Sequence, residues 1–230
     1  MSSSLSLQSI FSSDEFSDEG FDRPRWCGKE ACYTTLRKWV PPISTVSSSF
    51  NENSSNSSDL TATTTSDSSI GSSNAYEIIW HDSASGKCNI LVSIEQLTIN
   101  FPILGPRALV IEDYALSTDR SKVLLFTESQ KVWRLRTRGS YWVLDLSNQG
   151  NTSQLRRLGG KNTTHSDLMF ATFSPTNSAN VAYVRNHNIY VENVNTNEVF
   201  AVTTDGSDNV INGTFDWVYE EEFQLRNGFR

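Results

Sequence analysis

Two segments of this chain repeat one another, and this repeat constrains the fold more than any other feature of the sequence. Tyr114-Ala-Leu-Ser-Thr-Asp119 matches Ala171-Thr-Phe-Ser-Pro-Thr176, so that Ser117 corresponds to Ser174, 57 positions later. Each copy is followed by two runs of β-branched and aromatic residues, a polar turn and a third such run. The runs are 123–126, 141–146 and 155–158 in the first copy and 181–184, 188–194 and 199–202 in the second. Several strands per unit at this spacing are typical of β-propeller blades.

The strands themselves explain why the unit repeats. Each small antiparallel sheet carries apolar residues on both faces, and only neighbouring units can cover them. A propeller has about 4–8 blades, whereas this chain holds two clear units and a degenerate first one. We therefore expect an all-β fold, a partial β-propeller of several four-stranded antiparallel blades that is incomplete at the C-terminus. The alternative is a β-sandwich in which the similarity of the two segments is accidental.

Composition divides the chain into three parts. Residues 1–46 form an N-terminal segment with the strands of a first blade, and residues 75–230 hold the blades. Between them, residues 47–74 are almost entirely Ser, Thr, Asn and Asp, which bury too little apolar surface to offset the entropy of ordering them. We interpret this part as a flexible insertion. After it, 75–80 and 88–92 predict a hairpin, and 93–97 predicts the start of a short helix that later prolines end.

Charge and cysteine content exclude several classes of function. The chain has 26 acidic and 19 basic side chains, a formal net charge of −7, and its densest basic run, Arg134 to Arg138, holds three arginines. No nucleic-acid partner is expected, because phosphate binding needs clustered Lys and Arg. Cys27, Cys32 and Cys88 fall short of the four ligands of a closed zinc site, although Cys27 and Cys32 are spaced to meet across a turn. We expect ordinary or singly bridged cysteines, no metal site and no cofactor.

The segment after the second repeat departs from the pattern and carries three consecutive carboxylates. Glu220, Glu221 and Glu222 lie beside Trp, Tyr and Phe residues, where charge is unfavourable unless it is solvated or paired with a cation. One interpretation, which the residue pattern alone favours, is an exposed acidic turn of helix. The other is a cation site, in which two carboxylates share the three N–H donors of a protonated peptide amino terminus.

The same segment resembles a known family. Asp216-Trp-Val-Tyr-Glu-Glu-Glu222 is similar to the hallmark motif of the dipeptidyl peptidase IV family, serine peptidases that release dipeptides from peptide N-termini. The resemblance, to bacterial-type members, covers nearly the whole chain except the serine-rich insertion. Its further segments are 5–21, 33–36, 111–114, 132–146, 174–175, 181–184 and 225–230. It implies the propeller part of such a peptidase, with a short helical insertion that carries the glutamate triplet.

The resemblance also implies roles for particular residues. Glu221 and Glu222, the last two of the triplet, match the glutamates that hold the substrate's protonated amino terminus. Arg134, which follows Trp133, matches the arginine that binds the carbonyl of the second substrate residue and braces the glutamates. A guanidinium fork suits both tasks, whereas without the resemblance Arg134 is a surface arginine of a basic run. Glu220 is expected to be a structural neighbour, because successive helical residues point about 100° apart.

The sequence departs from the family pattern where a catalytic domain is expected. Family members carry an α/β-hydrolase domain whose catalytic serine lies in a G-x-S-x-G motif. No such motif occurs here, and His81, His165 and His187 fall in predicted turns or at strand edges. We therefore expect a truncated N-terminal part with no catalytic residue, inactive alone, whose hydrolase domain is supplied by sequence beyond Arg230.

The resemblance further implies partners and a location. The expected substrates are peptide N-termini of X-Pro or X-Ala type, with possible homodimerisation. Family members often act outside the cytoplasm or anchored to a membrane, although no signal peptide or membrane helix is found in this sequence. The alternative function is a non-catalytic propeller module that binds other proteins, since propellers serve many functions.

Overall fold

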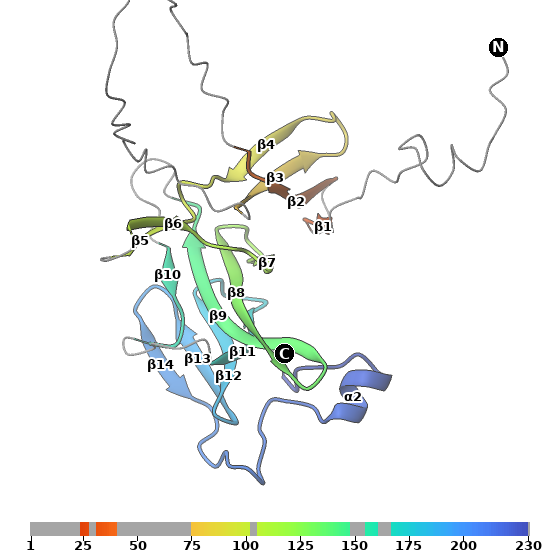
Figure 1. The fold of residues 1–230 in the computed structure, drawn as a ribbon, viewed down its shortest axis with the longest axis vertical. Coiled ribbons are helices and arrows are strands. Elements are labelled where there is room, and N and C mark those ends of the chain that lie inside the picture. The colour runs from red at the N-terminus through yellow and green to blue at the C-terminus, as the bar shows by residue number, and fades with distance from the viewer. Residues whose placement is uncertain are drawn as a thin grey trace, which may run out of the picture. The chain divides into compact units, whose positions relative to one another are not determined.

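The computed structural model describes residues 24–27, 31–40, 75–101, 105–147, 155–160 and 167–229 (Figure 1). The chain divides into two compact units, Met1–Arg37 with Ile78–Leu91 and Lys38–Glu77 with Val92–Arg230. The sheets of the described residues are antiparallel. Residues 5–21, the serine-rich insertion at 47–74 and His165 lie outside the described residues.

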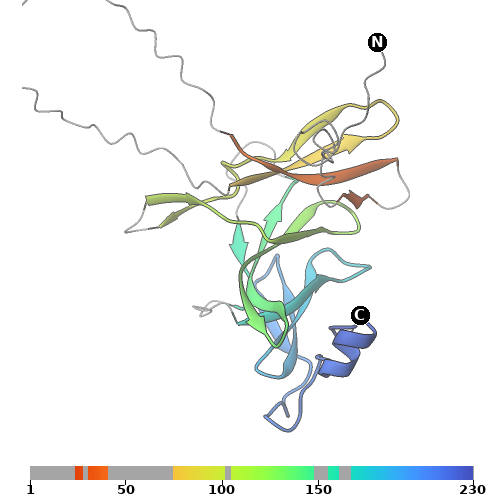
Figure 2. The ribbon, with the colours of Figure 1, turned by 45° about the vertical axis from the view of Figure 1, so that its right-hand side comes forward.

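A four-stranded sheet forms most of the described part of the first unit. Its strands, in the order β1-β2-β3-β4, are β1 (Arg25–Trp26), β2 (Cys32–Lys38), β3 (Tyr76–Asp82) and β4 (Cys88–Val92). The predicted hairpin is thus confirmed as β3 and β4 (Figure 2). Asp82 starts its turn, because the carboxylate accepts hydrogen bonds from Ala84 N (2.9 Å) and Ser85 Oγ (2.6 Å), as aspartates in turns do.

The helix expected at 93–97 is wrong. These residues form a turn, in which Leu97 N donates to Ile94 O (3.1 Å) and Thr98 Oγ1 donates to the same carbonyl (2.8 Å). The chain then continues into a two-stranded sheet, β5 (Thr98–Phe101) and β6 (Gly105–Ala108), with Asn100 opposite Pro106. Proline is tolerated in β6 because a strand of a two-stranded sheet has one edge without a ladder partner.

The two copies of the sequence repeat each form four strands. The first repeat unit is β7 (Asp113–Leu116), β8 (Lys122–Val132), β9 (Leu135–Asp145) and β10 (Arg156–Arg157). The second repeat unit is β11 (Leu168–Phe173), β12 (Asn180–Arg185), β13 (Asn188–Asn193) and β14 (Glu198–Ala201). Corresponding turns are alike, because Ser117 N donates to Lys122 O (3.0 Å) and Ser174 N donates to Asn180 O (2.9 Å). The predicted repeat of antiparallel strands is therefore confirmed.

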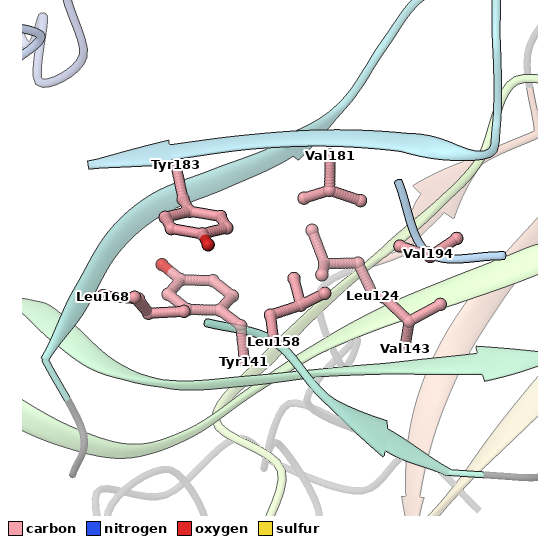
Figure 3. Packing of buried hydrophobic residues seen from close by; sticks show 8 residues of the cluster. All are labelled: Leu124, Tyr141, Val143, Leu158, Leu168, Val181, Tyr183 and Val194. Atoms are coloured by element: carbon pink, nitrogen blue, oxygen red, sulfur yellow. The ribbon is translucent and has the colours of Figure 1, made fainter. Parts of the chain in front are cut away.

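The two repeat units share one hydrophobic core. They join where Leu168 and Met169 of β11 pair with Gly139 and Arg138 of β9. Figure 3 shows side chains from both units facing one another across this core, which consists of Leu124, Tyr141, Val143, Leu158, Leu168, Val181, Tyr183 and Val194. Neither unit could bury these residues alone, which is the physical reason for the repetition. Burial also raises the pKa of the Tyr141 hydroxyl to about 12.

Asp119 links the turns of the two repeat units. Its Oδ2 accepts a hydrogen bond from Ser178 Oγ (2.6 Å) of the second unit. Its Oδ1 accepts from Ser117 Oγ (2.7 Å) and Ser121 Oγ (2.9 Å) of its own turn. These bonds favour the ionised carboxylate, so the pKa of Asp119 is well below its usual value, with the Ser178 bond the largest cause.

We expect acid to weaken this link. The pKa of Asp119 is lower in the folded chain than its ordinary value of about 3.9 in an unfolded one. The ionised carboxylate therefore stabilises the folded chain fully at pH values above about 3.9, and this stabilisation is lost as the pH falls through the lower pKa of the folded chain. The urea midpoint of the wild type should therefore exceed that of Ser178→Ala near neutral pH, and the difference should shrink below about pH 4. The effect is small, because Asp119 is exposed to solvent.

The second repeat unit supplies a matched control for this pH series. Ser174 corresponds to Ser117 in the repeat. The hydroxyl of Ser174 lies beside Thr176 Oγ1 (3.4 Å) and not beside a carboxylate, so Ser174→Ala removes a hydroxyl without affecting Asp119. Its difference in urea midpoint from the wild type should not vary with pH. A Ser178→Ala difference that stays constant down to about pH 2 would contradict the assignment.

Candidate functional site

The site begins with the tight turn between β8 and β9. Val132 pairs with Leu135, so Trp133 and Arg134 alone form the turn. Trp133 has a φ of 54°, a left-handed conformation that glycine normally supplies in such turns. Its ring is exposed, and the side chain of Arg134 projects from the tip of the hairpin with 77% of its surface accessible.

The glutamate triplet lies on α2 (Trp217–Glu222), so the short helical insertion is confirmed. Asp216 caps the helix, because its carboxylate accepts hydrogen bonds from Val218 N (3.0 Å) and Tyr219 N (3.2 Å). Capping by aspartate satisfies backbone donors that have no partner inside the helix. A run of aromatic contacts supports one side: the Phe215 and Tyr219 rings stack at 5.0 Å, and the Tyr219 and Phe223 rings lie 5.7 Å apart.

The loop that carries α2 is closed at its base. Thr214 pairs with Asn227, Gly228 N donates to Gly213 O (3.0 Å), and Phe215 N donates to Arg226 O (3.3 Å). Asn212 N donates to His187 O (3.0 Å), which ties this base to the turn between β12 and β13. The helix is therefore held by backbone bonds at both ends of its loop.

The tertiary structure brings Arg134 and Glu221 together. Arg134 Nε lies 2.9 Å from Glu221 Oε1, and both views show α2 beside the tip of the β8–β9 hairpin (Figure 1 and Figure 2). An ion pair this exposed contributes only about 0–1 kcal/mol to stability. Its geometry matters more than its energy, because the pair fixes a cation and a carboxylate at one place on the surface.

The three glutamates point in different directions, as the helical rotation requires. Glu220 is buried, with 6% of its surface accessible, and Glu221 keeps 25% of its side-chain surface. Glu222 is exposed, and among the described residues its side chain makes no ion pair or hydrogen bond. The structure thus pairs Arg134 with Glu221 and leaves the Glu222 carboxylate open to solvent.

A cavity of about 860 Å³ lies next to α2, which contributes Trp217 and Glu220 to its lining. Trp133 and Trp217 line it together with Glu220, but Glu221 and Glu222 do not. Its wall also holds Thr137 and Asp167, whose Oγ1 and Oδ1 atoms are buried without a hydrogen-bond partner in the described part of the chain. The residue pattern did not reveal this cavity, because its lining comes from segments that are far apart in the sequence.

Two of the three histidines lie in the described part of the chain. The His81 ring stacks on the Tyr33 ring at 4.6 Å and its Nε2 lies 2.9 Å from Thr35 Oγ1, whereas His187 lines the cavity. Within the described ranges, no group of three or more His, Cys, Asp or Glu residues is arranged to hold a metal ion. No helix that the structure describes is long and apolar enough to cross a membrane.

These features define a class of protein: repeated antiparallel propeller blades interrupted by an acidic helix. Residues 117–230 match the N-terminal region of dipeptidyl peptidase IV (DPP IV). The match covers 114 of the 230 residues and shows that this region resembles the dipeptidyl peptidase IV family.

Curated relatives and a solved structure agree with this assignment. A probable dipeptidyl-aminopeptidase B of Arthroderma gypseum is 42% identical over 106 residues, which is 46% of this chain and 11% of the relative. Dipeptidyl aminopeptidase B of Saccharomyces cerevisiae is 38% identical over 115 residues, which is 50% of this chain and 13% of the relative. Dipeptidyl peptidase 4 of Porphyromonas gingivalis matches the fold with a TM-score of 0.58 at 24% identity, over 98% of this chain and 26% of that one. The expected all-β partial propeller is confirmed, and the matched regions span a small part of each relative.

Proposed function

We propose that this chain forms the substrate-recognition part of a dipeptidyl peptidase IV-like serine exopeptidase. In this proposal Glu221 and Glu222 hold the protonated amino terminus of a peptide, and Arg134 binds the carbonyl of its second residue. A hydrolase domain outside this chain supplies the catalytic serine, and the substrates are peptides of X-Pro or X-Ala type.

The distance of 2.9 Å between Arg134 Nε and Glu221 Oε1 carries the proposal. A peptide amino terminus presents an ammonium group close to a carbonyl oxygen, so a carboxylate beside a guanidinium complements both. An ionised carboxylate has two oxygens and about four lone pairs. The Oε1 contact with Arg134 therefore leaves Glu221 Oε2 to accept from an ammonium group, and Glu222 adds a second carboxylate of high exposure.

Two anchors at different points of a peptide also determine where it is cut. An amine site alone lets the rest of the peptide rotate, whereas a second contact at the carbonyl sets both position and direction. Charge-assisted hydrogen bonds are the stronger kind, typically contributing about 1.5–3 kcal/mol. This arrangement measures a fixed length from the free amine, which is what the release of dipeptides requires.

The test is a titration of the chain with a short X-Pro amide that has a free amino terminus. Binding is detected from the NMR chemical shifts of the tryptophan indole N–H groups. We expect binding of this peptide and none of its N-acetylated form, because acetylation removes the ammonium charge. Glu221→Gln and Glu222→Gln should each weaken binding by roughly tenfold or more. Glu198→Gln, a neutralisation of an exposed carboxylate on β14, is the matched control and should change nothing.

The opposite results would refute the proposal. Equal binding of the free and acetylated peptides would show that no carboxylate recognises the amine. Saturable binding of folded proteins, without binding of the free-amine peptide, would favour a non-catalytic protein-binding module instead.

A further inference from the structure

Cys27 and Cys32 lie opposite each other at the end of the β1–β2 pair. The register pairs Arg25 with Thr34 and Trp26 with Tyr33, so the next opposed residues are the two cysteines. Cys27 N donates a hydrogen bond to Cys32 O at 3.0 Å, which shows that the pairing continues to this position. Directly opposed residues of antiparallel strands direct their side chains to the same face.

That face is the buried one. Cys27 and Cys32 expose 5% and 3% of their surfaces, whereas Trp26, on the alternate face, is 69% exposed. The Trp26 and Tyr33 rings meet edge to face at 5.7 Å on that outer face. Both thiol groups are therefore confined together on the inner side of the sheet, away from solvent.

The backbone spacing suits a covalent bond between them. Hydrogen-bonded partners in antiparallel strands have Cα atoms about 5.5 Å apart, within the roughly 4.4–6.8 Å of natural disulfides. Ala31 O, next to Cys32, accepts from Ser83 N (2.9 Å) and Ser83 Oγ (2.6 Å), which holds this side in place.

We propose that Cys27 and Cys32 form a disulfide bond that closes the β1–β2 hairpin. In this reaction the thiolate of one cysteine attacks a disulfide oxidant, such as oxidised glutathione, and releases one thiol. The second cysteine then attacks the mixed disulfide, which forms the Cys27–Cys32 bond and releases the second thiol. The two cysteines lose two electrons and two protons, and the oxidant is reduced to two thiols. Such a bond persists in an oxidising compartment.

Peptide mapping of the full chain tests the proposal, and the sequence makes the result unambiguous. The folded chain is equilibrated in a glutathione redox buffer, alkylated with iodoacetamide in denaturant without reductant, and digested with trypsin. Cleavage after Arg25, Lys29 and Arg37 places the two cysteines in separate peptides, 26–29 and 30–37. We expect these two peptides as one cross-linked species that separates on reduction, with Cys88, which is exposed, fully alkylated.

The folded structure should promote the Cys27–Cys32 bond beyond what the short distance between the two residues in the sequence achieves. At the same ratio of reduced to oxidised glutathione, the fraction of chains with this bond should be several-fold higher in the folded state than in urea. Cys88→Ser, the matched control, should leave the cross-linked species unchanged, whereas Cys27→Ser should leave Cys32 alkylated. Alkylation of both cysteines in the folded wild type, a bond from either one to Cys88, or equal linkage in urea would overturn the proposal. The mapping needs only the wild type, so the proposal can be tested even if a variant fails to fold.

Discussion

Glu192→Ala is expected to lower the free energy of unfolding by about 3 kcal/mol or more. Glu192 has no accessible surface, and its carboxylate has three partners. Arg156 Nη1 donates to Oε1 at 2.8 Å, while Gly159 N (2.8 Å) and Tyr183 Oη (3.1 Å) donate to Oε2. Alanine would remove one acceptor from a partly buried cation, a backbone donor and a buried hydroxyl, although Arg156 Nη1 would still donate to Asn197 Oδ1.

The network explains why the loss should be large. Arg156 and Gly159 belong to the end of the first repeat unit, whereas Tyr183 and Glu192 lie on β12 and β13 of the second. The carboxylate therefore connects the two units inside their shared core. Burial, followed by the charge of Glu192, raises the pKa of the Tyr183 hydroxyl, so this group stays a hydrogen-bond donor throughout the physiological range.

Urea unfolding followed by tryptophan fluorescence measures the effect. Glu192→Gln keeps one acceptor oxygen and should lose about 1–2 kcal/mol. Glu198→Ala, on the exposed β14 of the same unit, is the control and should stay within about 0.5 kcal/mol of the wild type. A Glu192→Ala chain as stable as this control would show that the carboxylate does not hold the units together.

Gly139→Ala is expected to destabilise the chain by about 1–3 kcal/mol through overpacking. A Cβ at this position would lie 2.7 Å from Thr127 O and 2.6 Å from Phe126 Cε2. The pairing of β8 with β9 shifts register between Thr127 and Gln130, and Glu128 there has a φ of 52°. This β-bulge brings the β8 backbone close to Gly139, which also pairs with Leu168 of β11 at the junction of the two repeat units.

Gly228→Ala is the matched control for this substitution. A Cβ there would come no closer than 3.6 Å to other atoms, an ordinary contact. The two variants remove the same glycine entropy from the unfolded chain, so the difference between their urea midpoints isolates the clash. Equal midpoints would mean that the bulge relaxes without loss, and the close approach would not be a constraint on the fold.

Strands and the capped helix could be predicted from the sequence because neighbouring residues determine them. Runs such as 123–126 and 181–184 form strands with several buried residues in succession, as expected of blades whose two faces are both covered. The acidic turn of helix that the residue pattern favours at the glutamate triplet corresponds to α2, and the structure adds that Asp216 caps it. The error at 93–97 has a local origin too, because a single turn such as the one closed by Leu97 N and Ile94 O uses the same short-range contacts as the first turn of a helix.

The candidate site was only partly accessible to sequence reasoning. Glu221, Glu222 and Arg134 were identified by resemblance, and their roles remain predictions. The helical rotation predicted that the three glutamates differ in direction, but the degree to which Glu220 is buried and the cavity lined by Trp133 and Trp217 had no signal in the sequence. They depend on the angle at which α2 sits on its closed loop.

By itself, the sequence determined the repeat, the strand periodicity and the short acidic helix, since each depends on backbone preferences and side-chain alternation over a few residues. The tertiary structure alone decided the junction of β9 with β11, the Arg134–Glu221 contact and the Glu192 network. These join distant segments, and their geometry depends on the register of the strands and on bulges such as that at Glu128. A register shift of one residue would turn the side chains to the opposite face, so only the folded chain places these groups within bonding distance.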